Sequence, residues 1–144
     1  GIADGRQMLA AMVLGAEGVQ MGSRFVACEE ASSHISFKEM IINSQEGDTK
    51  LSLKKLTPVR LLENDFARQV QEAERAGADA DALHAMLGRG RAKKGMFEGD
   101  LSQGELEIGQ VSALLREILP AATIVANTWR EFQEALSNPL RDQA

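Results

Sequence analysis

Two glycine-containing turns near the start of the chain carry residue types that suit phosphate binding. The first turn is Gly1–Gly5, with the sequence Gly-Ile-Ala-Asp-Gly, and the second contains Gly22 and Ser23. Because glycine has no Cβ, the backbone N–H groups of Gly1 and Gly22 can approach an anion closely, and Ser23 adds a hydroxyl. We therefore expect the two turns to hold one phosphate between them.

The residues around these turns predict a helix followed by a strand. Asp4 can cap a helix over residues 6–14, and Gly15 suits the C-terminal end of that helix. Residues 19–25 predict a short buried strand that runs into the second turn. In (β/α)8 barrels, turns of this kind hold phosphate after strands seven and eight. The apolar face of the helix is formed by Met8, Leu9, Met12, Val13 and Ala16.

From residue 32 onward the pattern becomes mainly helical, starting with a helix that Ser32 or Ser33 can cap. We therefore expect an α/β fold in two parts. Residues 1–31 form the last βα units of a (β/α)8 (TIM) barrel, and residues 32–144 form a mainly helical C-terminal region. A barrel needs roughly 200 residues or more, so we expect the chain to be a C-terminal piece of a longer protein.

The helical region should contain three more helices and one weak strand. The strand signal is the alternation of Leu51 and Leu53 with polar residues. The helices are a long one that ends at Gly77, a short one through Leu87 and a last one after Pro120. One side of the last helix is apolar and is formed by Val125, Trp129, Phe132 and Leu136.

The first turn and residues 19–25 resemble motifs of the nitronate monooxygenase family of FMN-binding barrels, which includes the flavin-type enoyl-acyl-carrier-protein reductases (type II). The family pattern is Gly-Gly-Ile-Ala-Asp-Gly, then Leu-Gly-Ala, then Val-Gln-Met/Val-Gly-Thr-Arg-Phe. The chain matches it at residues 1–5, 14–16 and 19–25, with Ser23 where threonine is commoner. Two later blocks also resemble the family: Glu29 with residues 33–38, and Gly99-Asp100, Gly104 and Gly109-Gln110.

The resemblance implies an FMN-dependent oxidoreductase that takes NAD(P)H as reductant. It implies enoyl-acyl-carrier-protein reduction as the activity, with oxidation of nitronates by O2 as the alternative. The family's catalytic histidine lies upstream in the barrel, and neither His34 nor His84 matches it, so no catalytic residue is expected in this chain. Gln20 could project toward the cofactor, or its side chain could instead form a hydrogen bond with a neighbouring backbone group. The cofactor-binding residues that the resemblance implies are Gly1, Ile2, Gln20, Met21, Gly22 and Ser23.

Composition and charge argue against several other classes of protein. A net charge of −5 is unfavourable for nonspecific nucleic-acid binding, and no apolar run approaches the roughly 18 residues of a membrane span. No His/Cys spacing supports a metal site. The single cysteine, Cys28, fits a reducing compartment, so we expect a cytoplasmic protein, and we also expect a homo-oligomer.

Four cations form a basic run within six residues: Arg89, Arg91, Lys93 and Lys94. They are either a solvated helix face or a landing site for an acidic partner, such as an acyl carrier protein or the phosphates of NADPH. A function of a different class also stays open. The chain alone could be a non-catalytic helical module that associates through apolar faces left exposed.

Overall fold

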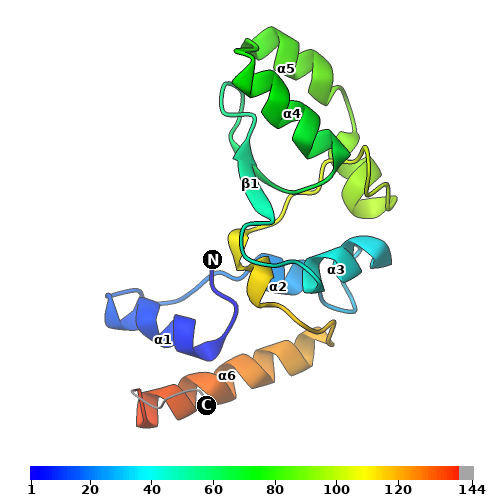
Figure 1. Cartoon of the computed structure of the whole chain (residues 1–144). Coiled ribbons are helices and arrows are strands. Elements are labelled where there is room, and N and C mark those ends of the chain that lie inside the picture. Colours follow the sequence, from blue (N-terminus) through cyan, green and yellow to red (C-terminus); the bar gives the residue numbers. More distant parts are fainter. Residues whose placement is uncertain (140–144) are drawn as a thin grey trace.

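Helices dominate the computed structural model, which describes residues 1–139 of the chain (Figure 1). The helix α1 with α6 forms one end, α2 and α3 lie in the middle, and α4 with α5 lies at the other end beside a two-stranded antiparallel sheet. The α-helices are α1 (Gly5–Val13), α2 (Ser23–Val26), α3 (Ile35–Ile42), α4 (Asp65–Arg75), α5 (Ala80–Leu87) and α6 (Ala121–Ser137). The other elements are β1 (Thr49–Ser52), β2 (Val59–Leu62), the π-helical turn η1 (Lys93–Phe97) and the 3-10 turn η2 (Gln110–Leu114).

Side-chain caps fix the starts of α1, α3, α4 and α5. The Asp4 carboxylate accepts the Gln7 N–H at 2.7 Å at the start of α1, and Asp79 accepts the Ala82 N–H at 2.9 Å at the start of α5. The Asp4 cap was predicted from the sequence. The expected cap of α3 was wrong, because the ring of His34 takes this position and neither Ser32 nor Ser33 does.

Two apolar cores lie along the length of the molecule. The core in the middle gathers residues from both ends of the chain, namely Ala3, Ala27, Phe37, Ile41, Leu62, Leu106, Ile108, Val111 and Leu115. The second core lies under the sheet and is formed by Leu53, Leu61, Phe66, Ala67, Val70 and Leu83. The boundary expected after residue 31 stays a prediction, although the first core draws on residues from both sides of it.

The strand expected over residues 19–25 was wrong. Residues 17–21 have no regular structure, and Ser23–Val26 forms the short helix α2. A strand needs a hydrogen-bonded neighbour, and in the one sheet that residues 1–139 contain, β1 pairs with β2, which also forms an isolated bridge from Leu61 to Glu107. The segment 17–21 therefore has no strand partner within the described residues.

The antiparallel hairpin confirms the strand expected at Leu51 and contains a second strand, β2, that was not predicted from the sequence. β1 covers the alternation at Leu51, and its partner β2 pairs with it in the register Thr49 to Leu62. The apolar residues of β2 run directly into those of α4, so the sequence pattern resembled one long helix. Asn64 separates the two elements because its side chain caps α4 by accepting the Ala67 N–H at 2.8 Å.

The helices α1 and α6 pack closely at Gly5, which explains the second glycine of the first turn. A Cβ placed on Gly5 would lie 2.1 Å from the Phe132 nitrogen and 2.4 Å from the Thr128 oxygen, so only glycine permits this approach. The contact also decides which side of α6 is buried. Phe132 is buried as predicted, whereas Val125, Trp129 and Leu136 are more than half exposed, as are Val13 and Leu14 at the end of α1. The predicted apolar faces are therefore only partly covered within residues 1–139.

Candidate functional site

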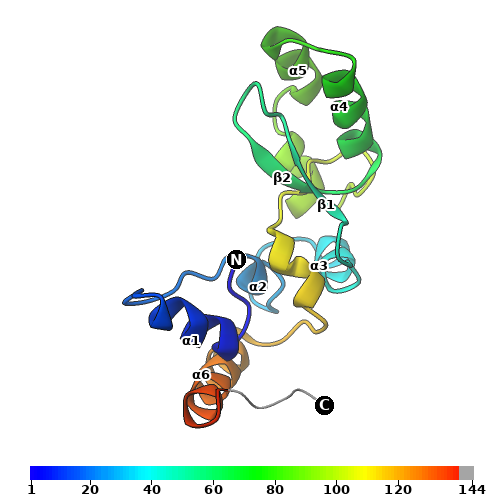
Figure 2. The same ribbon diagram turned by 60° about the vertical axis from the view of Figure 1, so that its left-hand side comes forward.

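The two glycine-containing turns lie against the same element, η2. A Cβ placed on Gly1 would lie 3.0 Å from the Val111 Cγ1 atom, and the Gly109 N–H donates to the Ser23 Oγ atom at 3.0 Å. Figure 2 shows the chain's N-terminus beside α2. Arg24, the residue after Ser23, lines a cleft of about 220 Å³ together with Ala3 and Asp4, so the end of the second turn lies near the N-terminal end of α1.

A run of free backbone donors leads into the second turn. Within residues 1–139, none of the N–H groups of residues 18–24 donates a hydrogen bond to a protein acceptor. Gly22 is exposed, and a Cβ there would meet nothing within 4 Å. The Ser23 hydroxyl oxygen accepts from Gly109, which leaves its hydrogen free to donate. Consecutive free N–H groups beside a glycine are the backbone chemistry that binds phosphate oxygens.

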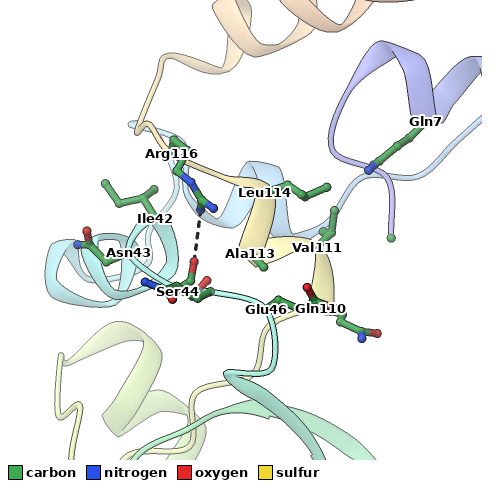
Figure 3. A pocket seen from close by; sticks show the side chains of 12 residues that line it. Gln7, Ile42, Asn43, Ser44, Glu46, Gln110, Val111, Ala113, Leu114 and Arg116 are labelled. Carbon is green, nitrogen blue, oxygen red and sulfur yellow. Dashed lines mark hydrogen bonds between the residues drawn. The ribbon is translucent and has the colours of Figure 1, made fainter. Parts of the chain in front are cut away.

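A large cleft, of about 780 Å³, opens beside the first turn (Figure 3). Gly1 and Gln7 contribute from the N-terminal segment, Gln110 from η2, and Ser44 from the end of α3. Arg116 fixes one wall by donating to the Ser44 carbonyl oxygen at 3.3 Å. Polar side chains thus surround a cleft that is continuous with the turn at Gly1.

The structure brings together only some of the residues predicted for the site. Gly1 lines the large cleft, whereas Ile2 and the segment 20–23 do not belong to its lining. Sequence reasoning missed Gln7 and Arg116 as lining residues. Gln110 had a signal in the Gly109-Gln110 motif, but Arg116 had none, because only the fold brings it beside Ser44.

The motif around His34 is built into the packing of α3. The His34 Nδ1 atom accepts the Ser36 N–H at 3.2 Å, and a Cβ on Gly99 would lie 2.4 Å from this same nitrogen. Gly99 has a φ of +81°, which glycine adopts without strain. The buried Lys38 ammonium donates to the carbonyl oxygens of Glu29 and Ala31 at 3.1 and 2.8 Å. These residues hold the segment after α2 in place, and His34 caps α3.

The Gly99–Gly104 motif forms a tight loop against η1. A Cβ on Gly104 would lie 2.1 Å from the Gly95 Cα atom, so the two backbones touch. The Asp100 carboxylate accepts the N–H groups of Ser102 and Gln103 at 3.1 and 2.8 Å. Its hydrogen bond with the Lys94 ammonium, followed by the one from Gln103, lowers the pKa of Asp100 to about 2. At neutral pH the charged Asp100 carboxylate therefore holds the loop through its bonds to Lys94, Ser102 and Gln103.

Most of the basic run is engaged within the chain. The Arg91 guanidinium lies 4.3 Å from the centre of the Phe66 ring and donates to the carbonyl oxygens of Met86, Leu87 and Gln103. Lys93 pairs with Glu98 at 3.2 Å and Lys94 with Asp100 at 2.8 Å. Arg91 thus has a structural role that the sequence did not suggest.

The described part of the chain contains neither a cluster of metal-binding side chains nor a membrane-spanning helix. Residues 1–139 contain no group of three or more His, Cys, Asp or Glu side chains that could hold a metal ion. Over the same residues, no helix is both long and apolar enough to cross a lipid bilayer.

Comparison with protein families gives one match that spans most of the chain. The family described as nitronate monooxygenase matches residues 1–131. The chain is 31% identical over 139 residues to a probable nitronate monooxygenase of Staphylococcus saprophyticus, and 34% identical over 139 residues to one of Staphylococcus aureus. These alignments cover 95% and 94% of the chain but 38% of each relative, so the chain spans less than half of their length.

Solved structures give the same picture. FabK from Thermotoga maritima is 40% identical with a TM-score of 0.88, over 96% of this chain and 44% of FabK. Nitroalkane oxidase from Streptomyces ansochromogenes is 28% identical with a TM-score of 0.72, over 94% of this chain and 38% of that enzyme. Both neighbours are TIM-barrel enzymes, so the predicted α/β class is confirmed: the chain corresponds to the end of such a barrel and the helical region that follows.

Proposed function

This chain belongs to the nitronate monooxygenase family, and from that premise we propose that it provides the phosphate end of the FMN site of an oxidoreductase. The observation that carries the proposal is the pair of free N–H groups at Gly22 and Ser23, near the end of the run over residues 18–24 and four residues beyond Gly18. This run and the turn at Gly1 both contact the N-terminal end of η2, at Gly109 and Val111 respectively.

The residues present fit the phosphate of a flavin mononucleotide. The N–H groups of Gly22 and Ser23 and the Ser23 hydroxyl would donate to its oxygens, and the turn at Gly1 would close the other side. Ile2, Gln20 and Met21 would line the cofactor next to its phosphate. When bound, FMN supplies the redox chemistry, while the protein binds and orients it.

For the reaction, we propose NAD(P)H-dependent reduction of an enoyl thioester carried by an acyl carrier protein in the cytoplasm. The support is the likeness to FabK, which exceeds that to nitroalkane oxidase in both identity and TM-score. Oxidation of nitronates with O2 is the alternative within the family. An assay of the enzyme that contains this chain decides between them: NAD(P)H consumption that requires an enoyl thioester supports reduction, and O2 consumption that requires a nitronate supports oxidation.

The phosphate site is testable on this chain alone by titration with FMN and with riboflavin, which lacks the phosphate. Each charge-assisted hydrogen bond is worth about 1.5–3 kcal/mol. Association costs about 4 kcal/mol or more, so we expect FMN to bind more weakly than micromolar. FMN should still bind more tightly than riboflavin, whose binding should not saturate.

Gly22→Ala should weaken FMN binding about fivefold, because the added methyl group hinders the approach of the phosphate to the backbone N–H and weakens roughly one hydrogen bond. Gly18→Ala is the matched control, because a Cβ at either position meets nothing within 4 Å and neither residue has a positive φ. Equal affinity for FMN and riboflavin would contradict the proposal. Submicromolar FMN binding would contradict the view that only the phosphate end lies here.

A second candidate, self-association through apolar faces, is favoured by the exposed side chains of α1 and α6. Leu14 is 89% exposed and Trp129 is 53% exposed. Large exposed apolar side chains are typical of interaction surfaces. If they mediate a homo-oligomer, light scattering should show a concentration-dependent mass that Leu14→Gln with Trp129→Gln abolishes. A monomer at all concentrations would reject this candidate.

A further inference from the structure

The sheet and α4 enclose a groove whose charge is not accounted for by the flavin site. The groove measures about 480 Å³ and lies between β1, the turn after it and α4, at the end of the molecule far from α1 and α6 (Figure 1). We call it the basic groove; its lining residues are Lys50, Leu51, Lys54, Lys55, Gln71, Glu74 and Arg75.

The four cations of the basic groove are exposed, and within residues 1–139 none of them forms an ion pair. The one acidic side chain in the lining is Glu74, whose carboxylate accepts the Lys54 backbone N–H at 2.8 Å. The Lys55 ammonium donates to the carbonyl oxygens of Gly77 and Ala78 at the end of α4. The charges of Lys50, Lys54 and Arg75 have no such partner and face outward on a chain whose net charge is −5.

The turn after β1 is shaped so that these cations stay at the surface. Leu53 has a φ of +56°, in a region that non-glycine residues rarely occupy, and its side chain is only 1% exposed. The chain therefore buries Leu53 in the core under the sheet while Lys54 and Lys55 remain exposed. The strain of this turn is offset by the burial of one leucine side chain.

Two features of the lining point to a ligand with both apolar and hydrogen-bonding groups. Leu51 is 45% exposed, and the aliphatic stems of the lysines extend its apolar surface. The Gln71 Nε2 atom is buried and has no hydrogen-bond partner among the described residues. A buried amide nitrogen without a partner costs stability, so a side-chain rearrangement that lets a ligand carboxylate reach it would be favourable.

We propose that the basic groove docks an acidic amphipathic helix of a partner protein. Carboxylates on that helix would pair with Lys50, Lys54 and Arg75, and an apolar side chain between them would contact Leu51. A free phosphate group fits less well, because the Lys54 N–H is already bound to Glu74 and the groove offers no run of backbone donors. This surface is independent of the flavin site, so either proposal can fail without the other.

The test is fluorescence anisotropy of the full chain with a labelled 14-residue helical peptide that carries glutamates around a central leucine. At low salt the chain should bind this peptide and not the same peptide with glutamine in place of glutamate. Exposed ion pairs contribute little each, so Lys50→Gln with Arg75→Gln should weaken binding about fivefold. Physiological salt should weaken it further.

The matched control is Lys93→Gln with Lys94→Gln, which removes the same two charges from cations that are already paired. We expect this control to change peptide affinity less than twofold. Leu51→Gln should weaken binding at constant charge, whereas Leu14→Gln, at the other end of the molecule, should not. Both residues are already exposed, so neither change should unfold the chain.

Four results would overturn the proposal. The first is equal weakening of peptide binding by the groove double variant (Lys50→Gln with Arg75→Gln) and by the control double variant. The second is equal affinity for the glutamate and glutamine peptides. The third is displacement of the peptide by millimolar inorganic phosphate, and the fourth is tighter binding of the chain to phosphatidylserine vesicles than to the peptide. The last two would assign the groove to phosphate ligands and to membranes, respectively. Circular dichroism of each variant would confirm that the fold is kept.

Discussion

The chain has two basic regions, and they differ in what their charges contact. The basic run is continuous in sequence, yet Arg91 is stacked on Phe66 and both lysines are paired. The basic groove is discontinuous, since β1, its turn and α4 each contribute cations, and these lack ion pairs within the described residues. Proximity in sequence therefore does not make a charged surface, because the fold decides which charges are neutralised internally.

The largest expected difference between the regions is in stability. Arg91→Ala removes a cation–π contact and hydrogen bonds to three carbonyl groups, and should lower the free energy of unfolding by about 2–3 kcal/mol. Arg75→Ala should change it by less than about 0.5 kcal/mol, since Arg75 is exposed and unpaired. Urea denaturation measures both.

Arg91→Lys sharpens this prediction. The lysine keeps the charge but cannot reach three carbonyl groups at once, so it should rescue little of the lost stability. If Arg91→Lys keeps the full wild-type free energy of unfolding, the positive charge alone would account for the stabilisation, and the contacts of Arg91 would not distinguish the basic run from the basic groove.

A smaller effect is expected in the pH dependence of the basic run. The pKa of Asp100 is lowered to about 2, chiefly by the hydrogen bond with Lys94, from an ordinary value of 3.8. A lowered pKa gives a stabilisation that is present above the ordinary pKa and is lost as pH falls through the folded value. Wild type should therefore exceed Asp100→Asn in stability at neutral pH, and this advantage should shrink between about pH 4 and pH 2.

The control for the pH experiment is Asp81→Asn, at an exposed acid on α5 outside both basic regions. Chemical denaturation of wild type and both variants is measured at each pH. If the Asp100→Asn difference stays constant down to about pH 2, the carboxylate is not held by Lys94.

The smallest expected effects have opposite signs. Lys93→Gln breaks an exposed ion pair and should cost about 0.2–1 kcal/mol at low salt. Lys50→Gln relieves repulsion among like charges and should be neutral or stabilising by a few tenths of a kcal/mol. Both differences should vanish in high salt. If both variants change the free energy of unfolding in the same direction at low salt, the proposed difference between paired and unpaired cations is contradicted.

Local features of the fold were predictable from the sequence, and long-range ones were not. The Asp4 cap was correct, because a cap depends on residues within one turn of a helix. The strand expected at residues 19–25 and the strand missed at Val59–Leu62 both depend on pairing with distant segments. Single-sequence patterns carry no information on such partners.

The candidate site shows the same limit. The turn at Gly1 and the segment around Gly22 could be found because glycine and serine mark backbone donors. That both turns pack on η2, and that Arg116 lines the neighbouring cleft, follows only from tertiary contacts. The basic groove was missed for the same reason, because Lys50 and Arg75 are 25 positions apart in the sequence.

The most direct test of the account is a backbone amide NMR titration of this chain, first with FMN and then with the acidic peptide. The account predicts two separate sets of shifted amides. FMN should move Gly22, Ser23 and their neighbours, and the peptide should move Leu51, Lys54 and Arg75. Shifts from FMN that fall in the basic groove and spare Gly22 and Ser23 would contradict the assignment of the flavin phosphate to the glycine turns.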